Sequence, residues 1–149
     1  MSDDDGCFFN VMRRYRTDCV DSAVYTKLRQ DQAALGINST WISADTNNIK
    51  STAIDLARFL TKVYTDQLSF ADGDRGRLLS ALRLSEPRDG IGSVFADTFN
   101  ATGSNGNQYA DAAIISSKRK LYVLVILTEG VSRADVVMLA ERIDGFMQR

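Results

Sequence analysis

Ser117 is the only serine in the chain that is followed three residues later by a lysine, Lys120. A lysine at this spacing can activate a serine hydroxyl, which is a weak nucleophile until a neighbouring base takes its proton. Ser117 lies, however, in a basic stretch between two apolar segments, Tyr109–Ile115 and Leu121–Leu127. This context is typical of a solvated hairpin turn, so the spacing predicts no catalytic role for Ser117.

Few other residues offer catalytic or metal-binding chemistry. The chain has no histidine, which excludes Ser-His-Asp and Cys-His catalysis and most zinc sites. Two cysteines, Cys7 and Cys19, are too few for a disulfide scaffold and leave open a single bridge. Cys19 stands near a predicted helix start, but Asp18 and Asp21 oppose a thiolate there, so we interpret it as a half-buried cysteine. We expect no metal and no cofactor.

Length and composition predict one globular domain. The 149 residues are 44% hydrophobic and 25% charged, and 18 basic against 19 acidic residues give a net charge of −1. No basic excess indicates nucleic-acid binding, and the longest apolar run, Leu121–Leu127, is far too short to span a membrane. The acidic start, Met1–Gly6, is unlike a signal peptide, so the chain as written is expected to stay in the cytoplasm.

Hydrophobic periodicity predicts an α+β order, with helices first, then a three-stranded antiparallel meander and a last helix. Residues 1–7 are expected to form a flexible tail and residues 8–149 a single domain. A small hairpin is expected within residues 38–50, and a loop over Asn100–Gln108. Helices are predicted over about 8–15, 17–32, 51–64, 72–84 and 132–147, and strands over 94–99, 109–115 and 121–127.

Three segments resemble the C-terminal part of the serine beta-lactamases and penicillin-binding proteins, in the class A-like group of bacterial serine hydrolases. They are Ala53–Leu68 (AIDLARFLTKVYTDQL), Asp74–Ile91 (DRGRLLSALRLSEPRDGI) and Tyr109–Met147. The resemblance covers the chain from about Met12 to its end. It implies a partial beta-lactamase-like fold that lacks the N-terminal strands and the nucleophile helix. It also implies a beta-lactam or peptidoglycan-type ligand, and a family that usually works outside the cytoplasm.

The resembled family carries three motifs around one groove: Ser-x-x-Lys, Ser-Asp-Asn and Lys-Thr-Gly. Thr17-Asp18-Cys19 matches the second motif best, although a plain helix cap explains these residues equally well. The third motif falls on Thr98-Phe99-Asn100 or, in another register, on Ala101-Thr102-Gly103, and neither has the lysine that would hold a substrate carboxylate. The resemblance therefore implies a relic groove at Thr17, Asp18, Thr98, Thr102 and Gly103.

Two functions stay open from the sequence. In one, the chain is a binding or interaction module that keeps the fold without the chemistry, a pseudoenzyme. In the other, it is a piece of an active serine hydrolase whose nucleophile comes from a missing N-terminal segment or from another chain. Degraded motifs at both surviving positions favour the first.

The strand Leu121–Leu127 is apolar on both faces, which predicts that it is covered on both sides. The segment Ala53–Tyr64 and the last helix are expected to cover the sheet faces, the latter by Val136, Val137, Leu139, Ala140, Ile143 and Phe146. In the resembled fold the outer edge of this strand pairs with an N-terminal strand that has no counterpart here. Since a free apolar edge promotes aggregation, we expect Cys7–Val11, a second copy of the chain or a partner chain to cover it.

Overall fold

A computed structural model of the chain describes residues 30–42, 49–85, 88–117 and 120–149. The predictions for Thr17, Asp18, the two cysteines and the flexible tail lie outside these residues. Within them, no helix is long and apolar enough to cross a membrane.

The described chain is α+β, as its sequence predicts. A helical stretch over residues 30–34 leads into a two-stranded hairpin, and this confirms the small hairpin expected within residues 38–50. Three helices, a three-stranded meander and a last helix follow the hairpin. The described elements in chain order are β1 (Trp41–Ile42), β2 (Ile49–Lys50), α3 (Ala53–Tyr64), α4 (Asp74–Arg83), α5 (Ile91–Val94), β3 (Thr98–Asn105), β4 (Gln108–Ser116), β5 (Leu121–Glu129) and α6 (Arg133–Met147).

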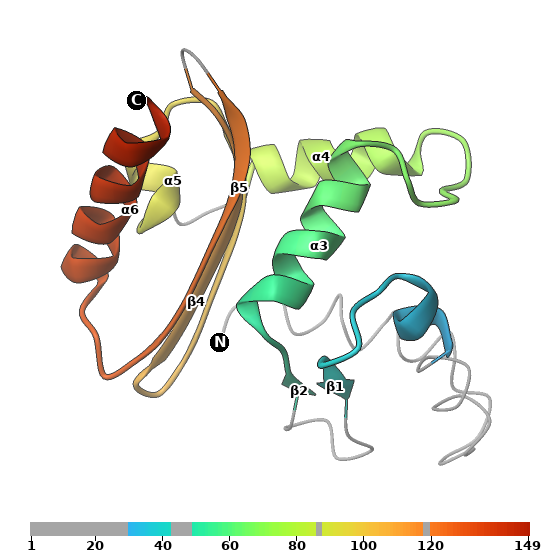
Figure 1. The fold of residues 1–149 in the computed structure, drawn as a ribbon, viewed down its shortest axis with the longest axis horizontal. Coiled ribbons are helices and arrows are strands. Elements are labelled where there is room, and N and C mark those ends of the chain that lie inside the picture. Colours follow the sequence, from blue (N-terminus) through green and yellow to red (C-terminus); the bar gives the residue numbers. More distant parts are fainter. Residues whose placement is uncertain (1–29, 43–48, 86–87, 118–119) are drawn as a thin grey trace.

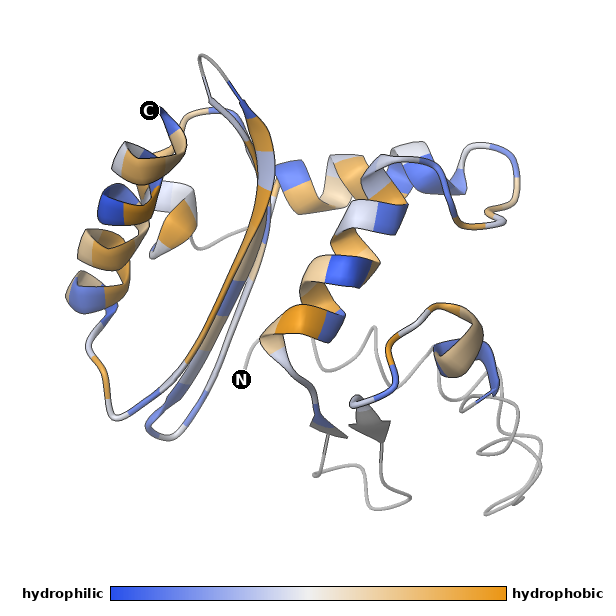
Figure 2. Ribbon diagram, viewed as in Figure 1, coloured by the Kyte–Doolittle hydropathy of each residue, from blue (hydrophilic) through white to orange (hydrophobic). Residues whose placement is uncertain are grey.

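The meander forms an antiparallel sheet in the order β3-β4-β5, and helices cover both of its faces. Figure 1 shows α5 and α6 on one side of the sheet, and α3 and α4 on the other. Helices therefore lie on both faces of the predicted apolar strand, as expected, although Leu121 and Leu127 at its two ends stay 48% and 39% exposed. Figure 2 shows that the sheet is most hydrophobic between these helical layers and hydrophilic towards the turn that joins β3 to β4.

Side-chain alternation along β4 builds a separate core on each face of the sheet. Alternate residues such as Ala113 and Ile115 pack with Ile91 of α5 and with Val136 and Ala140 of α6. Ile114 points to the opposite face, where α3 contributes its buried residues Leu60 and Val63.

Side-chain caps fix the starts of α3 and α6 close to the predicted helix starts. Thr52 accepts a hydrogen bond from the backbone N–H of Asp55 at 3.2 Å. Ser132 and Asp135 form a reciprocal capping box at the start of α6. At the other end of α6, the hydroxyl of Tyr122 donates to Asp144 at 2.7 Å and holds the helix against β5.

The first strand of the meander lies later in the chain than the sequence predicts. The prediction of a strand over 94–99 and a loop over Asn100–Gln108 is wrong, because β3 runs from Thr98 to Asn105 and pairs with β4 along its whole length. Gly106, at φ 60°, makes a two-residue turn possible, and this turn allows the polar residues before it to stay in the ladder. Of the predicted strand, Thr98 and Phe99 lie in β3, whereas Val94 is the last residue of the short helix α5.

The helices bury fewer residues than their apolar patterns suggest. In α6, Val136 and Ala140 are buried and Ile143 packs against the core, whereas Leu139 is 44% exposed and Phe146 is 69% exposed. A single helix that packs on a sheet buries only a narrow stripe of its surface, so the prediction that Leu139 and Phe146 face the sheet is wrong. Helix α4 buries none of its residues.

Candidate functional site

A groove of about 730 Å³ lies between the start of α3 and the hydrophilic end of the sheet. Its floor is formed by two rows of residues that lie side by side across the three strands. The first row is Gly103, Ala110 and Leu127, and the second is Asn105, Gln108 and Glu129. Lys50 and Ser51 form the facing wall.

The floor rows belong to the sheet face that α3 covers. Phe99 of β3 contacts Tyr64 of α3, with ring centroids 6.3 Å apart. Because side chains alternate along a strand, Ala101, Gly103 and Asn105 lie on this same face. The groove is therefore the part of the face that α3 leaves uncovered.

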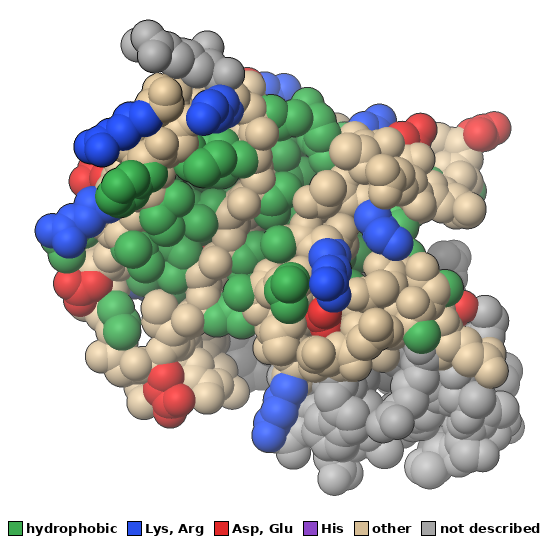
Figure 3. Space-filling model, in the orientation of Figure 1, with side chains coloured by type: hydrophobic (Ala, Val, Ile, Leu, Met, Phe, Trp, Pro, Cys, Tyr) green, Lys and Arg blue, Asp and Glu red, His purple; other side chains and the backbone are tan. Residues whose placement is uncertain are grey.

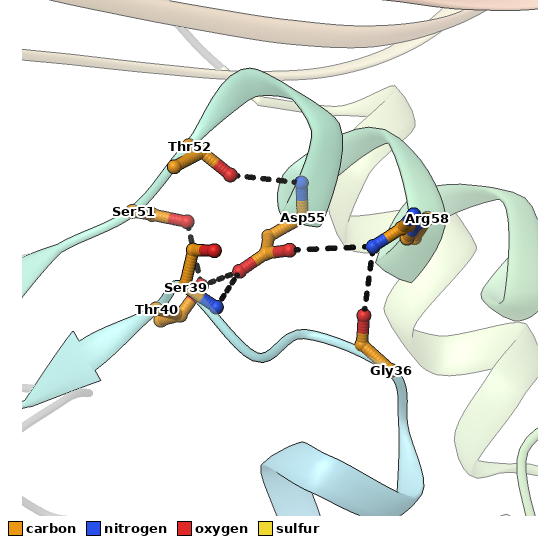
Figure 4. Close-up of polar contacts among 7 residues, drawn as sticks. All are labelled: Gly36, Ser39, Thr40, Ser51, Thr52, Asp55 and Arg58. Carbon is orange, nitrogen blue, oxygen red and sulfur yellow. Dashed lines mark hydrogen bonds and ion pairs between the residues drawn. The ribbon is translucent and has the colours of Figure 1, made fainter.

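Asp55 anchors the wall of the groove through the polar contacts that Figure 4 shows. Its side chain is 1% exposed, and Oδ2 accepts the backbone N–H of Ser39 at 2.8 Å and the hydroxyl of Thr40 at 3.0 Å. The Thr40 hydroxyl in turn shares a hydrogen bond of 2.8 Å with the hydroxyl of Ser51. A buried carboxylate in the first turn of α3 thus positions the groove residue Ser51.

Arg58 extends this network to the preceding segment. Its guanidinium lies 3.9 Å from Oδ1 of Asp55 and donates to the backbone carbonyl of Gly36 at 3.3 Å. An acidic residue in the first turn of a helix also interacts favourably with the helix dipole. The charge of Asp55 is therefore compensated within the fold.

The structure separates the residues that the sequence predicts for a relic groove. Gly103 lies in the groove floor, whereas the side chain of Thr102 points to the opposite face, where Thr102 lies beside Asp111 in the sheet register. Thr98 is fully buried on that opposite face, at the far end of β3. Thr17 and Asp18 lie outside the described residues. Of the two registers left open, the one over Ala101-Thr102-Gly103 is thus the one next to the groove.

Ser117 lies far from the groove, in the turn between β4 and β5. Its backbone N–H donates to the carbonyl of Lys120 at 3.0 Å, which closes the turn. Ala110 of the groove is seven residues away along β4, or roughly 23 Å at about 3.3 Å per residue. The turn predicted for Ser117 is confirmed.

A second polar cluster lies under α5 and α6. Asp111, which is fully buried, accepts the backbone N–H of Ile91 at 2.6 Å. The hydroxyl of Tyr109 donates to Asp89 at 3.1 Å and to Asp111 at 3.3 Å. Arg133 pairs with Asp89, and its guanidinium lies 5.5 Å from the centre of the Tyr109 ring. The cluster joins the α5 turn, β4 and the start of α6.

Burial dominates the electrostatics of this cluster. It raises the pKa of Asp111 to about 6, against the lowering effect of the hydrogen bonds from Ile91 and Tyr109. Burial, and then the charges of Asp111 and Asp89, raise the pKa of Tyr109. Tyr109 therefore acts as a neutral hydrogen-bond donor between two carboxyl groups.

Sequence reasoning missed this cluster and most of the groove. The ring of Tyr109 lies in the hydrophobic core, which its place in an apolar strand pattern suggests, but its hydroxyl belongs to the cluster. The available signal was Asp111, a single carboxylate inside the otherwise uncharged segment Tyr109–Ile115, because a buried charge needs partners. The groove residues Asn105, Gln108 and Glu129 carry no comparable signal, since polar residues beside a turn are ordinary.

The groove can hold a polar ligand by hydrogen bonds and charge. It offers one cation at Lys50, one anion at Glu129, and amides at Asn105 and Gln108. A Cβ added at Gly103 would meet nothing within 4 Å, so the face of the sheet is open to a ligand there. Among the described residues, no group of three or more His, Cys, Asp or Glu side chains is arranged to hold a metal ion.

Comparisons with known proteins match most of the chain. Residues 15–143 match the family described as the beta-lactamase enzyme family. Among solved structures, PBP-A is similar with a TM-score of 0.62 and 17% identity, over 80% of this chain and 51% of that chain. A mutant of PBP-A, described as an acyl-enzyme complex with penicillin G, gives the same TM-score and identity over 52% of its length. No curated protein matches the sequence. The chain thus spans about half the length of the structures that it resembles.

Proposed function

The chain belongs to the beta-lactamase enzyme family, and we propose that it is a non-catalytic member that binds a beta-lactam or a peptidoglycan-type peptide in the groove. It would then be a binding or interaction module. The family assignment supports the ligand class. The residues at the groove support the loss of catalytic activity.

The observation that carries this proposal is the position of Ala101 beside the groove. In the register over Ala101-Thr102-Gly103, alanine stands where the family motif has its lysine, two residues before Gly103 in the groove floor. A methyl group can neither bind a carboxylate nor take part in proton transfer. The only formal Ser-x-x-Lys of the chain lies in the turn after β4, at the opposite end of the sheet.

What remains in the groove is suited to binding. β3 is an edge strand of the sheet, so its outer backbone groups near Gly103 can pair with an amide-containing ligand, as an added strand pairs with a sheet edge. Lys50 on the facing wall supplies a positive charge for a ligand carboxylate. Thr102 and Gly103, with Thr17 and Asp18, are the positions we propose as remnants of the family's site. Thr98, although it fits the other register, is buried at the end of β3 that lies away from the groove.

A titration with penicillin G and with a peptidoglycan stem peptide tests this function. We expect saturable binding of at least one of them, and loss of that binding in Gly103→Leu, whose side chain would occupy the floor. Gly76→Leu is the matched control, because Gly76 also has open space around it but lies on α4, away from the groove. Absence of binding by the unaltered chain, or equal binding by both variants, would sink the proposal.

The alternative is that the chain is one piece of an active serine hydrolase. It is favoured by one observation, that about half of each PBP-A chain has no counterpart here. The nucleophile would then come from another segment or chain. Labelling with a fluorescent penicillin, alone and with the N-terminal half of a PBP-A-like protein added, separates the two. Covalent labelling of the mixture, without labelling of this chain by itself, would favour the alternative.

A further inference from the structure

The outer edge of β5 has no strand beside it in the described part of the chain. The sheet order is β3-β4-β5, so β5 pairs with β4 on one side only. The edge strand is nine residues long, and the segment from Leu121 to Thr128 contains no charged residue. Natural proteins usually protect such an edge with a charged side chain, a proline or a bulge, and β5 has no charge or proline in this segment.

Apolar side chains surround this edge. Figure 3, in which β5 lies in front, shows hydrophobic surface over β5 and over the adjoining side of α6. Leu121 and Leu127, near the two ends of β5, are 48% and 39% exposed. Helix α6 adds its exposed Met138, Leu139 and Phe146 to the apolar surface of the molecule. An apolar surface that continues across a free strand edge is typical of a protein interface.

The charges at the two ends of β5 decide which partner fits. The basic residues Lys118, Arg119 and Lys120 precede the strand, and Glu129 ends it. If two copies pair antiparallel, Lys120 of each lies at the end where the other carries Glu129. Parallel pairing would instead place like charges beside each other, which is unfavourable. The charges of the β5 edge are therefore complementary to those of a second copy when the two strands pair antiparallel.

We propose that a second copy of this chain pairs antiparallel with β5, so that two meanders join into one continuous sheet about a two-fold axis. Directly opposed residues must point to the same face, which allows pairing centred on Val125, with Val123 opposite Leu127 and Leu124 opposite Ile126. Such isologous pairing is the commonest form of dimer. Leu127 also lies in the groove floor, so the second copy would border the groove at its β5 side.

Sedimentation velocity over a range of concentrations tests this inference. We expect a dimer for the unaltered chain and a dimer dissociation constant at least about tenfold weaker for Leu127→Lys, which places a charge in the apolar contact. Leu84→Lys is the matched control, since Leu84 is 79% exposed at the end of α4, away from the edge. A monomer at every concentration, or equal dimers for both variants, overturns the inference.

A charge exchange tests the direction of pairing without touching the apolar residues. Lys120→Glu and Glu129→Lys alone should each weaken the dimer by roughly threefold to tenfold, because like charges then meet at both ends. The double variant should restore it, since the opposite charges meet again. Single variants that leave the dimer unchanged, or a double variant as weak as the singles, overturn antiparallel pairing. Glu129 also lies in the groove floor, so the dimer is measured without ligand and the result does not depend on ligand binding.

Discussion

The carboxylate of Asp111 accepts the backbone N–H of Ile91 at 2.6 Å and so joins the start of α5 to the middle of β4. The same carboxylate receives the hydroxyl of Tyr109, which also reaches Asp89. Arg133 closes the cluster from α6. One buried acid therefore holds three elements on the sheet face opposite the groove.

The titration of Asp111 predicts how stability changes with pH. Burial raises its pKa from 3.8 to about 6, so between about pH 4 and 6 the folded chain keeps a proton that the unfolded chain has released. The contribution of Asp111 is then fully present below about pH 4 and is lost as the pH rises to 6. Relative to Asp111→Asn, the free energy of unfolding should fall across this window by at most about 1.4 kcal/mol per pH unit.

Urea unfolding of both proteins at several pH values measures this difference. Asp89 and Tyr109 are the titratable groups that face Asp111, and both are kept in the variant. Parallel pH profiles of the two proteins would show that Asp111 does not titrate in this window.

Gly90 should tolerate no side chain, because the polar cluster fills the space above it. Its φ is 63°, and an added Cβ would lie 2.3 Å from Oδ2 of Asp111 and 2.5 Å from the hydroxyl oxygen of Tyr109. Gly90→Ala should therefore destabilise the fold by roughly 1–3 kcal/mol more than Gly73→Ala. Gly73 has a similar φ of 83° and open space around it, so it reports the backbone effect alone. Equal losses in thermal melts would contradict the packing.

The sequence predicted the elements whose ends carry local signals. Thr52 and Ser132 mark the starts of α3 and α6, because a hydroxyl before an apolar helical pattern caps the free N–H groups. The apolar patterns of the segments that form β4 and β5 predicted these two strands equally well. The family resemblance from the same segments is also confirmed.

Other features depend on contacts that a sequence does not display. Strand β3 is polar over Asn100–Asn105 and becomes a strand only because β4 pairs with it, so its pattern predicted a loop. The groove joins Lys50 to Glu129, residues far apart in the chain whose proximity follows from the packing of α3 on the sheet. Local secondary-structure propensity predicts neither the pairing of β3 with β4 nor the proximity of Lys50 to Glu129.

Asp55 should contribute more to the free energy of unfolding than an exposed acidic residue does. Asp55→Asn keeps the size of the side chain but removes the charge that Ser39, Thr40 and Arg58 satisfy. We expect a loss of roughly 1–3 kcal/mol in the free energy of unfolding by urea. Asp72→Asn, at an exposed position before α4, should change it by less than about 0.5 kcal/mol. Equal effects of the two would show that the Asp55 network is not stabilising.

Lys50 should contribute to ligand affinity through its charge. It is the one Lys or Arg that lines the groove within the described residues, and the ligands proposed carry a carboxylate. Lys50→Met should weaken binding by roughly fivefold at low salt and by less at high salt, because the pair is exposed and screened. Lys62→Met, on α3 outside the groove lining, is the control for equilibrium dialysis. An unchanged affinity in Lys50→Met would remove Lys50 from the site.

The proposed function requires that the groove bind penicillin G without forming a covalent bond. Incubation with penicillin G, followed by equilibrium dialysis and by intact-mass measurement of the same sample, tests this. We predict saturable, reversible binding and an unchanged mass of the chain. A mass increased by one penicillin molecule would contradict the claim and show that the chain still acylates.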